Sequence, residues 1–232
     1  VLKREKKDTG KIRNMKQKED TVDRYQVLCE EWRQIFLKMD LETVAAKLPG
    51  LKLTEEALKF NYFGEPHRID RKTGFIWNEA AKERLTDFGN LMIVYHLLYY
   101  SEEHPVLSGE WVPFREVKMA GVFDAAYQKM AVKPFAQTFA EKTELLKQVA
   151  SRLGFPDEKY GDVSFRVPVF DCLPLIFIFW DGDDEYPAQA NILFDRNITA
   201  FTHAETVVLI AEMASARLIR AAGEDWDFIQ EI

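Results

Sequence analysis

Cysteine is scarce in this chain, and its scarcity excludes two kinds of protein. Only Cys29 and Cys172 occur among 232 residues, and they do not form a CxxC pair. Such a pattern provides neither a disulfide framework nor a cysteine-based metal knuckle. A chain of this length can bury enough apolar surface to be stable without either of them.

Long apolar runs and the common catalytic or phosphate-binding motifs are also missing. The longest apolar run, 91–100, contains His96 and has about half the length of a membrane helix. No apolar segment of the kind found in signal peptides follows the basic start of the sequence. No P-loop, GxGxxG, GxSxG or HExxH motif is present. We therefore expect a cytoplasmic protein without a membrane partner, and the motifs leave open whether it is an enzyme.

Positive charge is concentrated at one end of the chain. Residues 1–14 hold six basic and two acidic side chains, so with a formal net charge of −7 the remainder carries −11. An acidic body repels a phosphate backbone, and we therefore expect no nucleic-acid partner. Residues 1–20 lack hydrophobic periodicity and are predicted to form a disordered basic tail.

Two segments show the alternation of apolar and polar residues that is typical of strands. A hairpin is predicted near 57–77 and a three-stranded meander near 163–195. Aromatic residues make up 13% of the chain and include 17 Phe, which indicates a core or a ligand pocket rich in rings. The stretch 101–117 shows no such alternation and is expected to be a loop.

Apolar residues three and four positions apart predict helices in most of the other segments. The predicted helices are one from Asp20 or Thr21 to Met39, a short one capped by Asp40, a long and centrally buried one opened by Asn78, two on either side of Pro134, and one begun by a Thr202–Glu205 capping box. Antiparallel strands packed with a buried central helix and further amphipathic helices define an α+β fold. We expect a single domain over 21–232.

The densest polar feature is the turn formed by Asp181, Asp183, Asp184 and Glu185, with Asp195 one strand later. Clustered carboxylates can bind calcium or magnesium, but the EF-hand positions that require Gly and Glu are occupied here by Tyr186 and Ile192. Asp and Gly are also what a solvated hairpin turn requires. We favour the turn and keep two alternatives, a metal site and a hydrogen-bonding role of Asp183 and Glu185 toward a ligand.

His96 lies within an apolar helical segment. A neutral imidazole there can serve as a ligand to a metal or to tetrapyrrole iron. The commoner case is a histidine satisfied by one hydrogen bond in the core, which we favour.

The loop 109–116 places Trp111 and Phe114 beside Arg115. The two rings could form a stacking wall and the guanidinium could clamp a carboxylate, which together would bind a planar acidic ligand. The alternative is that the rings attach the loop to the core while Arg115 pairs with Glu116 or solvent.

Taken together, these segments resemble the bacterial domain-of-unknown-function family 3786. The resemblance spans about residues 22–220 and is carried by GFIW, YHLLYY, GEWVPFREV, GDVSF, LPLIFIFWDGDDEYPA, NILFD and THAETVVLIAEMASARL, in this order. It implies a cytoplasmic protein of mainly anaerobic bacteria, in a family without a settled activity that keeps company with corrinoid-linked metabolism. Some relatives look fused to a cysteine-rich iron–sulfur segment, which this chain lacks, and the resemblance provides no catalytic residue.

Three hypotheses for function follow from these observations. In the first, the protein binds a small molecule or cofactor, such as a corrinoid or another tetrapyrrole, through Trp111, Phe114, Arg115, His96, Asp183 and Glu185. In the second, it is a metal-dependent enzyme that uses the carboxylates of Asp181–Glu185. In the third, it is an interaction or maturation factor for a redox partner, and its acidic body steers it toward a basic surface. The sequence identifies neither the cofactor nor catalytic residues.

Overall fold

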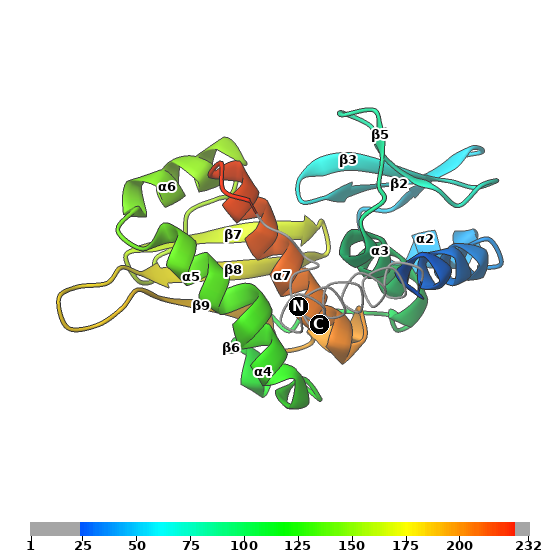
Figure 1. The fold of residues 1–232 in the computed structure, drawn as a ribbon. Helices are drawn as coiled ribbons and strands as arrows, with labels where there is room; N and C mark the ends of the chain where they lie inside the picture. The colour runs from blue at the N-terminus through cyan, green and yellow to red at the C-terminus, as the bar shows by residue number, and fades with distance from the viewer. Residues whose placement is uncertain (1–23, 226–232) are drawn as a thin grey trace, which may run out of the picture.

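The strands of the chain join into one antiparallel sheet. The computed structural model describes residues 24–225, and within them nine strands pair in the order β5-β4-β3-β2-β7-β8-β9-β6, with β1 added to β2. Helices pack against this sheet, which confirms the predicted α+β fold (Figure 1). The predicted basic tail and the predicted helix start at Asp20 or Thr21 lie outside the described residues.

The N-terminal half, residues 24–100, contains the predicted hairpin. A helix covers 24–36 and is followed by α2 (Leu41–Lys47), β1 (Lys52–Leu53), β2 (Ala57–Tyr62), β3 (Glu65–Asp70), β4 (Ile76–Asn78), β5 (Glu83–Arg84) and α3 (Phe88–Tyr100). Asp40 caps α2 as predicted, because its carboxylate accepts the N–H groups of Glu42 and Thr43. Tyr95 of α3 donates a hydrogen bond of 2.9 Å to the carbonyl of Gly74 and so joins α3 to the hairpin.

The C-terminal half, residues 101–225, contains the predicted meander. Its elements are β6 (Trp111–Pro113), α4 (Asp124–Tyr127), a π-helical turn (Gln128–Val132), α5 (Lys133–Phe139), α6 (Thr143–Arg152), β7 (Val163–Phe170), β8 (Leu173–Trp180), β9 (Gln189–Asp195) and α7 (Ala204–Ala221). Helices α4, α5 and α7 cover one face of the meander (Figure 1). On this face Phe135 of α5 packs against Phe177 and Phe179, with ring centroids 5.2 and 6.2 Å apart.

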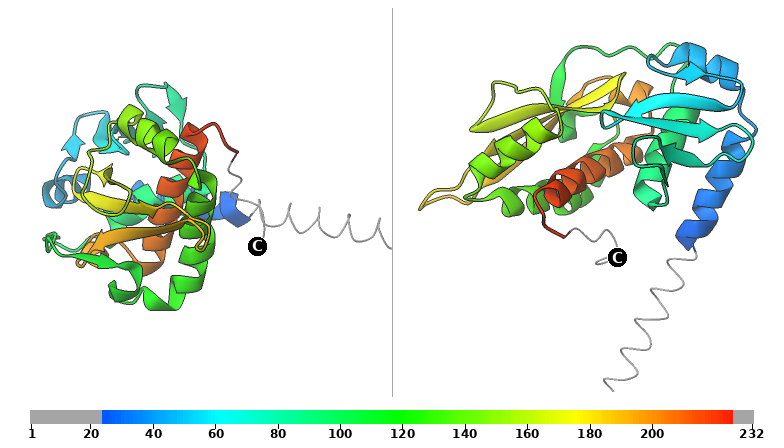
Figure 2. Two further views of the ribbon diagram at one scale, coloured as in Figure 1. Left: turned by 90° about the vertical axis from the view of Figure 1, so that its left-hand side faces the viewer. Right: turned by 90° about the horizontal axis from the view of Figure 1, so that it is seen from above.

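The two halves lie side by side, and the sheet is narrow where they meet (Figure 2). Strands β2 and β7 pair at one position only, Tyr62 opposite Phe170, and the N–H of Phe63 adds a hydrogen bond to the carbonyl of Val169. By contrast β7 and β8 pair along almost their whole length. The sheet therefore contributes little to holding the halves together.

Helix α3 begins at Phe88, and the prediction that Asn78 opens it is wrong. Asp87 is the cap, because its carboxylate accepts the N–H of Asn90 at 3.0 Å. The side chain of Asn78 accepts the N–H groups of Ala80 and Ala81, both at 2.9 Å, and so stabilises a turn that leads to β5. An Asn side chain caps turns as readily as helices, which explains the error.

The predicted break at Pro134 is also wrong. Pro134 is the second residue of α5, and the π-helical turn before it continues the helical run from α4, so the chain passes Pro134 without leaving a helical conformation. The run ends instead before Glu141, which adopts a left-handed conformation with φ of 60°.

Helix α7 is the most deeply buried helix among the described residues. Most of its side chains are buried, including Val207, Ala211, Ala214 and Leu218 of the predicted inward stripe. Its cap is His203 and not the predicted Thr202: the imidazole Nδ1 accepts the N–H of Glu205 at 3.3 Å.

The predicted loop 101–117 contains a strand. Trp111–Pro113 forms β6, which pairs with β9 through Val112 and Phe194 at the edge of the sheet. Asp195 at the end of β9 holds the preceding loop, because its carboxylate accepts the N–H groups of Ser108 (2.9 Å), Gly109 (2.7 Å) and Asn197 (2.8 Å) and also the hydroxyl of Ser108. Asp195 is 2% exposed and lies at the opposite end of β9 from the acidic turn, so the two do not form one cluster.

Replacing Asp195 should therefore destabilise the fold markedly. Asp195→Ala leaves three N–H groups without their charged acceptor, and we expect a loss of about 2–4 kcal/mol in the free energy of unfolding. Denaturant titration measures this loss, with the exposed Asp184→Ala as the matched control. If both variants unfold at the same denaturant concentration, the loop does not depend on Asp195.

Candidate functional site

In the structure the side chains of Trp111, Phe114 and Arg115 contact different partners. Phe114 is 1% exposed and stacks on Tyr127 of α4, with ring centroids 4.2 Å apart. Arg115 is exposed and donates a hydrogen bond of 2.7 Å to Asp124. The guanidinium carbon of Arg166 lies over the ring of Trp111, 5.5 Å from the centroid of that ring. Phe114 thus packs in the core as in the alternative interpretation, and ligand binding by Trp111 and Arg115 stays a prediction.

In the acidic turn between β8 and β9, Asp183 holds the backbone of the turn and Asp181 attaches the turn to the start of α6. Asp181 accepts the hydroxyl of Thr143 at 2.6 Å and the N–H of Glu141 at 2.8 Å, and these bonds lower its pKa. Asp183 accepts the N–H groups of Glu185 and Tyr186 at 2.9 and 2.8 Å, which lowers its pKa as well. These contacts are typical of a structured turn.

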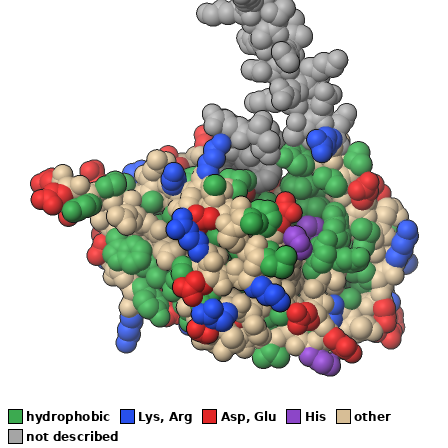
Figure 3. Space-filling model, turned by 90° about the horizontal axis from the view of Figure 1, so that it is seen from below, with side chains coloured by type: hydrophobic (Ala, Val, Ile, Leu, Met, Phe, Trp, Pro, Cys, Tyr) green, Lys and Arg blue, Asp and Glu red, His purple; other side chains and the backbone are tan. Residues whose placement is uncertain are grey.

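The same turn projects from the molecule as a largely acidic tip (Figure 3). Across residues 24–225 no three His, Cys, Asp or Glu side chains are arranged to hold a metal ion. A role of Asp183 and Glu185 toward a ligand stays a prediction.

His96 lies at the contact between α3 and α7. Its Nδ1 is 2.7 Å from the hydroxyl oxygen of Thr206, while its Nε2 is buried without a hydrogen-bond partner among the described residues. Burial, and to a smaller extent the neighbouring His203, lowers the pKa of His96 to about 4. The imidazole is therefore neutral at pH 7.

Aromatic rings surround His96 and continue to the surface. The ring of Trp32, from the helix 24–36, lies 4.3 Å from His96, 5.2 Å from Tyr99 and 5.7 Å from Tyr100. Tyr99 and Tyr100 are 52% and 40% exposed, and Val27 and Leu28 on the outer face of the same helix are exposed as well. We call Trp32, Tyr99, Tyr100, Val27 and Leu28 the aromatic surface; on this side of the molecule hydrophobic side chains gather, with a histidine beside them (Figure 3).

The sequence alone does not reveal this surface. Trp32 belongs to a stripe that predicts core packing, and the two tyrosines end a run that predicts a buried helix. The pair of tyrosines at the end of that run could have predicted an exposed aromatic surface, because a tyrosine at a helix end can direct its hydroxyl to water.

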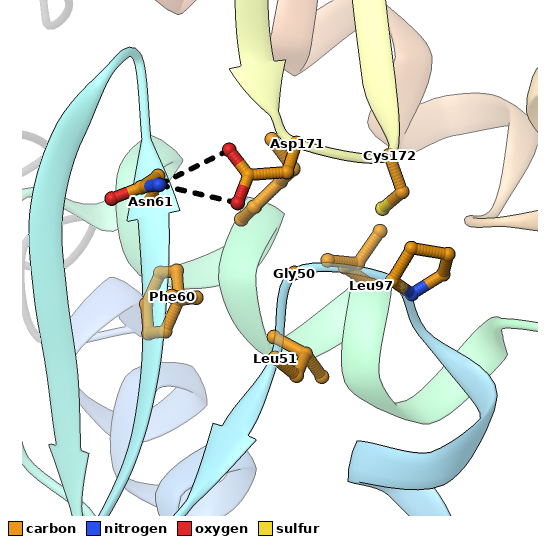
Figure 4. A pocket seen from close by; sticks show the side chains of 9 residues that line it. Gly50, Leu51, Phe60, Asn61, Leu97, Asp171 and Cys172 are labelled. Atoms are coloured by element: carbon orange, nitrogen blue, oxygen red, sulfur yellow. Dashed lines mark hydrogen bonds between the residues drawn. The ribbon is translucent and has the colours of Figure 1, made fainter.

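A small crevice opens beside the narrow join of the sheet (Figure 4). Asn61 of β2 donates to both carboxylate oxygens of Asp171, each at 3.2 Å, and Cys172 follows in the turn between β7 and β8. The crevice encloses about 0 Å³ that a water molecule could occupy, whereas ligand pockets hold roughly 300–1,000 Å³. Burial, with a smaller effect of Asp171, raises the pKa of the Cys172 thiol to about 11. The thiol is therefore protonated and unreactive at neutral pH.

Gly50 closes the floor of this crevice. It adopts φ of 88°, and a Cβ atom there would lie 2.6 Å from Oδ2 of Asp171. The contact requires glycine, so we interpret the crevice as a packing feature of the join.

Hydrogen bonds connect β2 to the start of α3, and a buried carboxyl of α7 lies close enough to be affected by the charge of Asp87. The hydroxyl of Tyr62 donates to Asn90 at 2.8 Å, and the amide of Asn90 donates to Asp87 at 2.9 Å. Glu212 of α7 is 1% exposed, and its Oε2 has no hydrogen-bond partner among the described residues. Burial, followed by the carboxylate of Asp87, raises the pKa of Glu212 to about 8.

The fold and the aromatic surface together describe an α+β domain whose exposed rings stand on two packed helices. The chain belongs to the family described as Domain of unknown function (DUF3786), whose model matches residues 40–217. This match confirms the resemblance seen in the sequence. No curated protein and no solved structure gives a significant match. Over residues 24–225 no helix is both long enough and apolar enough to span a membrane.

The buried Glu212 should make the stability of the protein depend on pH. Its pKa is higher in the folded than in the unfolded chain, so the folded state binds more protons and loses stability as the pH rises from about 4.5 to 8. We expect Glu212→Gln to remove this part of the pH dependence and to stabilise the protein at pH 8, on the order of 2–4 kcal/mol. Thermal melting between pH 5 and 8 measures both effects, and the exposed Glu205→Gln on the same helix is the control. If Glu212→Gln and the unmodified chain have the same melting temperature at every pH, Glu212 is not a source of the pH dependence.

Proposed function

We propose that the protein is a cytoplasmic binding module that docks a protein partner through the aromatic surface. The observation that carries this proposal is the exposure of Tyr99 and Tyr100 next to Trp32, Val27 and Leu28. Contiguous exposed apolar side chains mark interaction sites, and Tyr and Trp are the residues most enriched among those that dominate binding.

The exposure of the tyrosine rings favours a protein, and not a small planar ligand, as the binding partner. Ligand sites are concave and bury most of the ligand surface between their walls. Tyr99 and Tyr100 instead stand 52% and 40% exposed, with ring planes 84° apart. Rings that meet at right angles cannot both stack on one flat molecule, whereas the side chains of a protein can contact each of them.

The packing beneath the surface keeps the rings in place. His96 contacts Trp32 and Tyr100 edge-on and is held by Thr206 of α7, and His203 lies 5.4 Å from Tyr100. A surface that is ordered before binding loses less conformational entropy when the partner arrives.

Selection from a displayed peptide library tests the proposal. We expect the protein to enrich a common peptide pattern, and the double variant Tyr99→Ser/Tyr100→Ser to bind the enriched peptides at least tenfold more weakly. The control is Tyr186→Ser, which removes a tyrosine that is 64% exposed on the acidic turn. Tyr99 and Tyr100 also pack on Trp32, so melting curves taken alongside separate a loss of binding from a loss of folding.

Two results would contradict the docking proposal. One is a selection that enriches no pattern, and the other is a set of peptides that bind the double variant as well as they bind the unmodified chain.

The second candidate is the binding of a tetrapyrrole, such as a corrinoid of anaerobic metabolism, by His96. It is favoured by one observation: Nε2 has no hydrogen-bond partner within residues 24–225, while Nδ1 is held by Thr206. Metal-bound histidines commonly bind the metal through one ring nitrogen and a second protein group through the other. Because Nε2 is buried beside Trp32, that ring would have to move aside for coordination.

Absorbance spectroscopy tests this second candidate. If His96 is an axial ligand, haemin or cobalamin added to anaerobically purified protein should change its visible spectrum in a saturable way, and His96→Ala should abolish the change. Trp32→Leu should then strengthen binding, because it opens the path to Nε2. An unchanged spectrum at micromolar protein and cofactor rules against tetrapyrrole binding by His96.

A further inference from the structure

Acidic residues adjoin residues of the aromatic surface in the sequence, and Glu31 shares a helical face with Val27 and Leu28. Glu31 precedes Trp32, Glu102 and Glu103 follow Tyr100, and Glu205 follows His203. All four carboxylates are exposed, and none forms an ion pair with another residue of the 24–225 region. Unpaired carboxylates beside an apolar patch repel one another and attract a cation.

Fewer positive charges lie near them. The ammonium of Lys47 donates a hydrogen bond of 2.7 Å to the carbonyl of Ser101, next to Glu102, and keeps its charge there. Arg24 lies on the same helical face as Val27 and Leu28. His96 adds no charge at neutral pH, since its pKa is lowered to about 4. Residues 24–225 as a whole show the same excess of negative charge, with 31 Asp and Glu against 23 Lys and Arg.

The geometry of the rings suits a cation as well. Trp32 and Tyr99 meet at 81°, so the edge of one ring contacts the other and part of the ring faces is directed away from the contact. The face of an aromatic ring carries partial negative charge and attracts an ammonium or guanidinium group placed over it. Carboxylates around such rings add to this attraction.

We infer that the partner is a protein segment with a basic face, whose arginine or lysine side chains lie over the rings of Tyr99 and Tyr100 between Glu31, Glu102, Glu103 and Glu205. This inference rests on the proposed docking function and specifies its chemistry. Arginine fits better than lysine, because a planar guanidinium can stack on a ring and bind a carboxylate at once.

Matched peptides test the inference directly. The probe is a fluorescein-labelled peptide of alternating arginine and glycine, and its control has citrulline in place of every arginine, which keeps the shape and removes the charge. We expect the arginine peptide to bind at least tenfold more tightly, and its affinity to fall as salt is raised. The double variant Tyr99→Leu/Tyr100→Leu keeps an apolar surface without ring faces and should weaken binding about threefold to thirtyfold.

The acidic turn between β8 and β9 is a second place where a basic peptide could bind, and it provides the control. Asp184→Asn/Glu185→Gln removes two exposed charges from that turn. Arginine-peptide binding that persists in this variant and weakens in the leucine variant supports the inference. Binding that is lost in the turn variant and unchanged in the leucine variant overturns it.

Failure of the inference can be told apart from failure of the docking proposal. If the arginine and citrulline peptides bind equally, and both are lost in Tyr99→Ser/Tyr100→Ser, the docking surface stands and the basic partner is wrong. If the arginine peptide does not bind at millimolar concentration while library peptides still bind through the tyrosines, the basic partner is again wrong. If no peptide of either kind depends on the tyrosines, both proposals fail together.

Discussion

The contact between α3 and α7 is the interaction on which the arrangement of the molecule depends. Within residues 24–225, β2 and β7 pair only at Tyr62 and Phe170, and Phe63 and Val169 add one backbone hydrogen bond, so most of the contact between the halves comes from helices and side chains. The two helices approach closely at Gly89, where a Cβ atom would lie 2.9 Å from the sulfur of Met213. The bond between His96 and Thr206 and the burial of Glu212 belong to the same contact. It also sets the place of the aromatic surface, because Tyr99 and Tyr100 continue α3 beyond the point where α7 covers it.

Local patterns in the sequence predicted the elements whose partners lie nearby in the chain. The alternation in 57–77 and 163–195 gave the hairpin and the meander, since each strand pairs with the next one. β6 was missed because three residues show no alternation and its partner β9 lies about 80 positions away. The start of α3 and the break at Pro134 were wrong for another reason: Asn78 and Pro134 each fit two local structures, and only the packing around them selects one.

The candidate site could be predicted only in part, for the same physical reason. The sequence indicated that His96 is buried, but its partner Thr206 lies 110 residues away and no local pattern connects them. The sequence left open whether the rings of the 109–116 loop form a ligand wall or attach the loop to the core. Phe114 belongs to the core, because its ring contacts Tyr127 of α4 and Phe194 of β9. The aromatic surface forms where the helix 24–36 packs beside α3. A hydrophobic stripe in the sequence does not show which of its residues remain exposed at the edge of that contact.

The narrow join also bears on how the chain folds during synthesis. β2 and β3 are separated by two residues, as are β7 and β8, so each half can form its strands from contacts of short sequence separation, which form quickly. The step that unites them is slower, because α3 must wait for α7, which follows every strand in the chain. Until α7 has left the ribosome, the apolar face of α3 faces water or whatever binds it there. A nascent chain of this kind passes through a stage in which its first half is formed but its central helix is uncovered.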